Sequence, residues 1–460
     1  MLPILRLALP AALAIIVLGP AAGVALSGRD LQDPQFFITS TVVESPIAQL
    51  VLRTSTLAIV LLATSAIVVR MLQRQGPSLQ PLALAMLAAF ATFFCTNVVV
   101  PGLFGHLPGL EKGYFYVLIV FIGLFASRAE TGTLLDAVKW SILLFLVLSV
   151  AYAVVRPDAA LRTYAPELRL PLVPFRFWGL SAGPNLLAPL ALTLLLIAVA
   201  RPFSSRLWQR FAVLAAIAVI LVAQSQTTWI ASAIIVPALL YFRHRQRRFG
   251  HMRVTAPPGL VLASFGLAAG AAVLAVAIGL AGSAVESVVP TPSLSGGSDL
   301  LTGRGRIWRV ALSTFAAYPL FGYGLSAWSA EFRDMIGISA AFHAHNQLLQ
   351  SLSVAGVVGG VGLVVYAATL LVCSFRTATA TNGLAPALLV LAAIGSVSET
   401  PFDLATPLVG DTLRHALLFA VVVGAAGRRA PEPRPAVGRG RQGLSQRPAT
   451  RRPVHRPRFS

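Results

Sequence analysis

Long apolar segments recur along almost the entire chain, and they constrain its fold more than any other feature. Since about 20 apolar residues form a helix that crosses a bilayer, the pattern predicts an all-α polytopic membrane protein with about twelve transmembrane helices. Only 11% of the residues are charged, whereas soluble domains carry about 25%. The segments cover residues 7–26, 51–69, 80–100, 114–127, 140–155, 182–200, 211–224, 229–242, 258–281, 346–372, 384–397 and 412–425.

Two of the shorter segments, 211–224 and 229–242, leave the number of spans open. Arg210 and Arg243 bracket this pair in the sense that two spans require. A single re-entrant hairpin fits the same apolar pattern, because each segment is shorter than an ordinary span. Both interpretations predict helices on either side of a turn near residue 226.

Basic residues are unevenly divided between the two sets of loops that alternate along the chain. If the N-terminus is inside, the inner set holds 24 of the 36 basic residues and three acids, and the outer set holds 12 basic and 13 acidic residues. Cytoplasmic loops of membrane proteins are rich in Lys and Arg, so we expect both termini in the cytoplasm. The net charge of +20 then indicates attraction to membrane lipid and not to nucleic acid.

Composition divides the chain into three expected regions. Residues 1–170 hold the first transmembrane helices, and residues 171–426 hold the others together with a long extracytoplasmic loop at 283–345. Residues 427–460 are rich in Arg and Pro and poor in apolar residues. Such a segment cannot bury a core, so it is expected to be a disordered basic tail in the cytoplasm.

The loop at 283–345 carries a dense group of polar residues. It includes Arg304, Arg306, Trp308 and His345. Arginine binds phosphate through paired, charge-assisted hydrogen bonds, and histidine can exchange a proton near neutral pH. Together they fit a reaction with a phosphate leaving group and a hydroxyl nucleophile. The alternative is that the Arg and Trp side chains only anchor helix ends at the bilayer surface.

Two other features of this loop have less specific interpretations. Gly322-Tyr323-Gly324 matches part of the potassium-channel filter sequence, but it lacks the preceding Thr-Val and occurs once, so a tight turn is expected. His343 and His345 are two residues apart, and residues at that spacing do not share a helix face. We therefore expect no metal site there, and no cofactor elsewhere.

The residues after the loop resemble a signature of the bacterial O-antigen ligase family. His345-Asn346 is followed after nine residues by Gly356-Val-Val-Gly359, in the pattern His-[Asn/Ser/Gln]-x9-Gly-x-x-Gly. Upstream, Arg304-x-x-x-Trp308 and then Pro-Leu-Phe-Gly-Tyr-Gly at 319–324 are similar to the stretch that precedes this signature in the family.

Two further motifs extend the resemblance in both directions. Asn185, which follows Arg176 and Gly179 at the start of the sixth apolar segment, resembles one family element. Ser398-Glu399-Thr400 after the eleventh segment resembles another. The resemblance runs from about residue 176 to residue 424, and the first five segments match only in hydropathy.

The resemblance implies a helical glycosyltransferase of the GT-C type in the bacterial cytoplasmic membrane. Such enzymes take a glycan from undecaprenyl pyrophosphate on the outer face and pass it to a sugar hydroxyl, with inversion and without a metal. The implied activity is that of an exopolysaccharide or surface-polysaccharide polymerase, or of an O-antigen-type ligase. The implied partners are the undecaprenyl-pyrophosphate-linked donor, a glycan or lipid-glycan acceptor, and membrane lipid.

The resemblance also implies roles for individual residues. His345 is the expected base or the residue that orients the acceptor, Asn346 fixes it, and Glu399 orients it or binds sugar. Arg304 is the expected pyrophosphate clamp. Arg306 is a second clamp by proximity only. The other positions that match family motifs are Asn185, Trp308, Gly356 and Gly359.

One position departs from the family pattern. The family usually has a basic residue in the turn between the seventh and eighth spans, where this chain has Gln226. A neutral amide can donate a hydrogen bond to a phosphate oxygen but supplies no charge. We therefore expect another arginine, Arg176 first of all, to replace the missing charge.

A transporter or flippase of lipid-linked sugars is the alternative function. Transporters place charges or broken helices near the midplane of several spans, whereas the apolar segments here are nearly free of charge. This distribution favours an enzyme with its site at the membrane surface. The sequence does not separate a polymerase from a ligase, because the donor is shared and only the acceptor differs.

Overall fold

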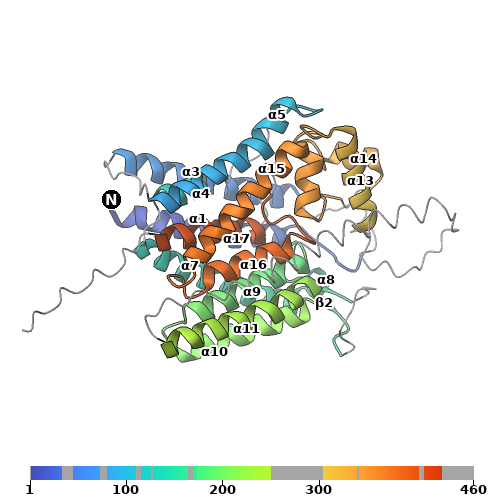
Figure 1. Cartoon of the computed structure of the whole chain (residues 1–460). Helices are drawn as coiled ribbons and strands as arrows, with labels where there is room; N and C mark the ends of the chain where they lie inside the picture. The colour runs from blue at the N-terminus through green and yellow to red at the C-terminus, as the bar shows by residue number, and fades with distance from the viewer. Residues whose placement is uncertain are drawn as a thin grey trace, which may run out of the picture. The chain divides into compact units, whose positions relative to one another are not determined.

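The described part of the chain is mostly helical (Figure 1). The computed structural model describes residues 2–33, 45–72, 80–109, 116–125, 128–163, 170, 172–249, 304–338, 341–403 and 409–426. The helices are α1 Leu2–Leu26, α3 Pro46–Leu72, α4 Pro81–Phe94, the π-helix η2 Cys95–Val99, α5 Val100–Phe104, α6 Tyr116–Phe125, α7 Arg128–Val155, α8 Pro157–Ala160, α9 Pro184–Ala200, α10 Arg206–Val222, α11 Gln226–Phe249, α13 Arg304–Ala317, α14 Ala330–Ile336, α15 Gln347–Arg376, α16 Leu384–Gly395 and α17 Val409–Ala426.

Long apolar helices confirm that the chain is a helical membrane protein. Five helices in the described residues are long and apolar enough to cross a membrane: Leu7–Leu26, Pro46–Leu72, Pro81–Phe104, Glu130–Val155 and Gln347–Arg376. Large side chains on them, such as Leu61, Val361 and Val364, are exposed, as lipid-facing residues are. The count of twelve spans stays a prediction, and the expected segment at 258–281 lies outside the described residues.

Helix α17 lies in the middle of the bundle (Figure 1) and packs against α1, α4, α6, α7, α9 and α16. Its residues from Leu413 to Val423 are buried on every side. Most of these residues are apolar, and a helix that is apolar on most of its faces needs such an enclosed position. Phe402, in the segment 396–403 that follows α16, packs against His415 of this helix with ring centroids 5.3 Å apart.

Helices α10 and α11 form the pair of apolar segments on either side of the turn, with 17 and 24 residues. At 1.5 Å per residue they are about 26 and 36 Å long. The turn between them is held by the buried Gln224, whose amide donates to the carbonyls of Phe175 at 2.8 Å and Val173 at 3.3 Å. This contact ties the start of α11 to the segment before α9.

Helix α15 is broken at Gly356, which has φ +64° and ψ −157°. The amides of Val357 and Val358 turn outward and donate to the carbonyls of Pro319 and Leu320 at 2.8 and 3.3 Å. In return, residues 323 and 324 donate to carbonyls of α15. The expected tight turn at 322–324 is therefore present, and it supplies the hydrogen bonds that the break in α15 requires.

Gly356→Ala tests this account of the break. A Cβ there would lie 2.4 Å from the backbone of Leu320, and the backbone conformation is open only to glycine. We expect the variant to lose about 2 kcal/mol or more of unfolding free energy and to melt at a lower temperature in detergent. The control is Gly395→Ala, where an added Cβ meets nothing within 4 Å. Equal melting of both variants would contradict the account.

Candidate active site

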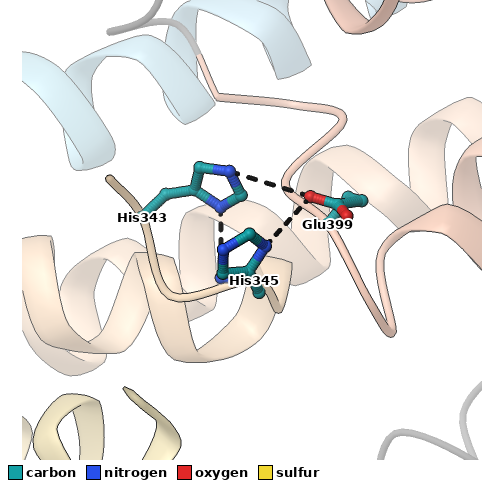
Figure 2. A group of neighbouring side chains, drawn as sticks. All are labelled: His343, His345 and Glu399. Carbon is teal, nitrogen blue, oxygen red and sulfur yellow. Dashed lines mark hydrogen bonds and ion pairs between the residues drawn. The ribbon is translucent and has the colours of Figure 1, made fainter. Parts of the chain in front are cut away.

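The carboxylate of Glu399 joins several candidate residues that lie far apart in the sequence. Glu399 follows α16, and its side chain is 14% exposed. Its Oε1 accepts a hydrogen bond from Arg304 at 3.0 Å and another from Asn185 Nδ2 at 3.3 Å. Its Oε2 lies 3.1 Å from Nδ1 of His345. Figure 2 shows this carboxylate facing His345 and its neighbour His343.

The start of α15 is fastened to the segment after α16, and this brings His345 to Glu399. The amide of Gln347 donates to the carbonyl of Ser396 at 2.9 Å. The side chain of Gln347 accepts from the amide of Phe402 at 2.9 Å. These backbone contacts fix the distance between the two elements independently of the charged pair.

Asn346 caps helix α15. Its Oδ1 accepts hydrogen bonds from the amides of Leu348 and Leu349, both at 3.1 Å, and its Nδ2 donates to the carbonyl of Val397 at 3.3 Å. It is 1% exposed. The sequence places Asn346 among the catalytic residues, and these contacts hold the start of α15 directly after His345.

His343 and His345 lie side by side, with ring centroids 4.0 Å apart (Figure 2). The sequence argument that separates them assumes a helix, but both residues lie in the loop before α15. The amide of His345 donates to Nδ1 of His343 at 3.1 Å, and His345 has φ +48°. The sequence pattern predicts no role for His343, and only its closeness to His345 in the sequence points to one.

Arg176 reaches the cluster through Asn185. It lies on β2 (Arg176–Phe177), which pairs antiparallel with β1 (Leu161–Arg162), and it donates to Asn185 Oδ1 at 3.2 Å. Its Nε donates to the carbonyl of Ala223 in the turn before α11 at 3.3 Å. Arg176 therefore orients the amide that binds Glu399, and it also contacts the turn near Gln226.

A buried arginine that the sequence analysis missed holds the segment before α9. Arg29 is 3% exposed and donates to the carbonyls of Ala159, Gly179 and Ser181 at 2.8, 2.6 and 2.6 Å. Its partners are backbone groups more than 100 residues away, so no sequence motif marks the contact. It fixes the loop that leads to Asn185.

Gln226 and Arg306 are the remaining candidates for binding the pyrophosphate. Gln226 is exposed at the first position of α11, and the next residue, Thr227, lies 2.9 Å from the hydroxyl of Ser398. Arg306 is exposed and donates to the carbonyl of Ile336 at 3.4 Å, away from Glu399. The start of α11 therefore belongs to the surroundings of the cluster, and Arg306 faces α14.

Trp308 and Gly359 pack the elements that carry the cluster. Trp308 is 2% exposed and packs in the core formed by α13 and α14, with Trp328 and Phe332. The carbonyl of Gly359 accepts a hydrogen bond from Asn97 of η2 at 3.0 Å. These motif positions act on helix packing and not on the polar centre.

The protonation states follow from burial and charge. Burial alone would raise the pKa of the Glu399 carboxyl, but His345, Arg304 and His343 together hold that pKa well below its usual range. Burial, and then the charge of His345, lowers the pKa of His343 to about 3. At neutral pH the centre therefore contains a carboxylate and a neutral His343.

The contact with a carboxylate also sets the tautomer of His345. An ionised carboxylate only accepts hydrogen bonds, so Nδ1 of His345 donates to Oε2 of Glu399 at 3.1 Å. The lone pair of the neutral ring is then on Nε2. A base oriented by a carboxylate in this way is the arrangement found in serine hydrolases.

His343, His345 and Glu399 also place ligand-type atoms within 4.8 Å of one another. Two histidines and one glutamate can bind zinc. In this structure Nδ1 of His343 accepts a backbone hydrogen bond, and Arg304 shares the carboxylate. A cation at this position would compete with both contacts.

Comparison with known proteins identifies the region that holds most of these residues. The model of a family described as O-antigen ligase matches residues 211–364 of the chain. This confirms the family recognised from the motifs, and it indicates a membrane enzyme of the O-antigen ligase or polymerase type. The matched residues include Arg304 and His345, whereas Asn185 and Glu399 lie outside them. No curated protein matches the chain.

Glu399→Gln tests the charge state of the centre. Because the folded-state pKa of Glu399 is lowered, its charge stabilises the fold above the ordinary carboxyl pKa of 4.5, and this stabilisation is lost as the pH falls below that value. We expect the variant to lose roughly 1.5–3 kcal/mol at pH 7, and the difference from wild type to shrink below pH 4.5. Melting curves at pH 7 and pH 4 measure this.

The control for that experiment is Asp334→Asn, which removes an exposed carboxylate of α14. It should melt like the wild type at both pH values. A Glu399→Gln variant whose difference from wild type stays the same at pH 4 and pH 7 would contradict the assigned charge.

Proposed function

We propose that the protein is a glycosyltransferase of the bacterial cytoplasmic membrane that transfers or polymerises a glycan from an undecaprenyl-pyrophosphate-linked donor onto a sugar hydroxyl. One observation carries this proposal: the carboxylate of Glu399 binds Arg304 through one oxygen and His345 through the other. An anion-binding side chain and an oriented base thus meet at one centre. This is what transfer from a pyrophosphate to a hydroxyl needs.

The leaving pyrophosphate is bound by Arg304 and by helix starts. Arg304 is the first residue of α13, Asn185 is the second of α9, and Thr227 is the second of α11. Free backbone N–H groups and the helix dipole favour anions at such ends. In the free protein Glu399 is the anion that satisfies Arg304. The donor pyrophosphate takes over part of this contact when it binds.

His345 supplies the base. Its Nε2 accepts the proton of the acceptor hydroxyl, the hydroxyl oxygen bonds to the anomeric carbon, and the bond from that carbon to the pyrophosphate oxygen breaks. The negative charge leaves with the pyrophosphate and is stabilised by Arg304, and the new positive charge on His345 is stabilised by Glu399. Attack opposite the leaving group inverts the anomeric configuration.

The position of the cluster supports an enzyme over a transporter. The residues that bind Glu399 lie at helix starts and in loops, and Glu399 itself lies in the segment after α16. A transport pathway would need such groups near the middle of the spans. We assign the cluster to the outer face of the membrane, with both termini in the cytoplasm and a GT-C-type helical arrangement.

His345→Ala and Arg304→Ala test the proposal. A positioned base contributes about 10²–10⁴-fold, and one charge-stabilising group about 10²–10³-fold. We therefore expect each variant to lose at least about 100-fold in glycan transfer by purified protein in liposomes with a polyprenyl-pyrophosphate-linked donor. The control is Arg309→Ala, an exposed arginine of the same helix α13, which should transfer at the wild-type rate.

Equal melting temperatures of the variants would separate lost chemistry from lost folding. Transfer near the wild-type rate in both His345→Ala and Arg304→Ala would contradict the site.

Deletion of the gene followed by a glycan gel separates polymerase from ligase. Single repeat units left on the carrier mean that the protein polymerises. Full-length chains stranded on undecaprenyl pyrophosphate mean that it ligates. An unchanged glycan pattern would contradict both forms of the proposal.

A further inference from the structure

His343 is a buried histidine within the centre that the proposed mechanism does not use. Its side chain is only 20% exposed, and it lies beside both His345 and Glu399, which also contact each other (Figure 2). Three roles are chemically open to such a residue: a second base, a metal ligand, or a group that positions its neighbours. The hydrogen bonds around its two ring nitrogens decide among them.

The Nδ1 atom of His343 is occupied by a backbone donor. The amide of His345 donates to it at 3.1 Å. A nitrogen that accepts a hydrogen bond uses its lone pair and carries no proton. The proton of the neutral ring is therefore on Nε2, which lies 3.7 Å from Oε2 of Glu399. That N–H faces the same oxygen that binds His345.

This tautomer leaves His343 no free lone pair. A base needs a lone pair to take a proton, and a metal ligand needs one to donate. Metal binding through Nε2 would require the proton to move to Nδ1, where it would meet the amide hydrogen of His345. The geometry thus disfavours both a second base and a metal site.

The contact to the amide also supports an unusual backbone conformation. His345 has φ +48°, a left-handed conformation that costs a non-glycine residue roughly 1–2 kcal/mol. The loop is held on the same side by Ala344, whose amide donates to Gln350 at 2.8 Å. Within this held loop, His343 is the side chain that accepts the amide of the proposed base.

We propose that His343 is a positioning residue, a neutral imidazole fixed as the Nε2–H tautomer, which holds the backbone of His345 through Nδ1 and faces the carboxylate of Glu399 with Nε2–H at 3.7 Å. This inference rests on the proposed role of His345 as base. The low pKa of His343 agrees with it, because a ring that stays neutral leaves the transferred proton on His345.

Three variants separate the two contacts of His343. His343→Leu removes both and should lower transfer by about 100-fold, because a displaced base loses that much. His343→Asn keeps an acceptor near Nδ1 and should retain about tenfold more activity than His343→Leu. His244→Leu, at an exposed histidine of α11, is the matched control and should transfer at the wild-type rate.

Nitrogen-15 NMR of histidine-labelled protein in nanodiscs tests the tautomer without any activity. The chain has seven histidines, and the signal of His343 is the one that His343→Asn removes. We expect the neutral Nε2–H form from pH 6 to pH 8. An Nδ1–H form, or protonation within this range, would overturn the inference. A fixed tautomer in a protein that transfers no glycan would instead refute the proposed function and leave only the contact between His343 and the backbone of His345.

A chelator tests the competing metal site. Transfer by the wild-type protein should be the same with and without EDTA. Loss of transfer with EDTA and its recovery with Zn²⁺ would overturn the proposal, because a bound metal needs the lone pair that the assigned tautomer withholds.

Discussion

The ion pair between Glu399 and Arg304, with His345 on the second carboxylate oxygen, is the interaction on which the rest of the site depends. An acid with so little solvent exposure stays charged only because cationic and N–H groups surround it. Those groups come from the starts of α9, α13 and α15. The carboxylate therefore ties the starts of α9 and α13 to the segment after α16, to which Gln347 already fastens the start of α15.

The packing around the site explains why a glycine signature accompanies the histidine. Gly356 breaks α15 where the turn at 319–324 donates and accepts the missing hydrogen bonds, and Gly359 binds Asn97 through its carbonyl. The two glycines lie on α15 and the histidine lies in the loop directly before it, and they have different roles. His345 meets Glu399, whereas Gly356 anchors the segment that follows α13. The eleven positions from His345 to Gly356 thus span the first part of α15, from the contact with Glu399 to the contact with the turn at 319–324.

The sequence predicted the helical membrane fold and the grouping of Arg304, His345 and Glu399, because hydropathy and motif order are properties of the chain itself. It did not predict that Arg306 faces α14. Arg304 and Arg306 both lie on helix α13, and residues two apart on a helix do not point to the same side. It missed His343 because the spacing argument assumed a helix where the chain forms a loop. No sequence motif marks Arg29, because its partners are backbone carbonyls more than 100 residues away.

The central claim is that Glu399 couples Arg304, which binds the pyrophosphate, to His345, which acts as the base. A double-mutant cycle of Arg304→Lys and His345→Gln on the rate of glycan transfer tests it most directly. Residues that act as a unit are not additive. The account predicts that the double variant loses less than the product of the single losses, by a coupling of about 1 kcal/mol or more. Losses that simply multiply would contradict it.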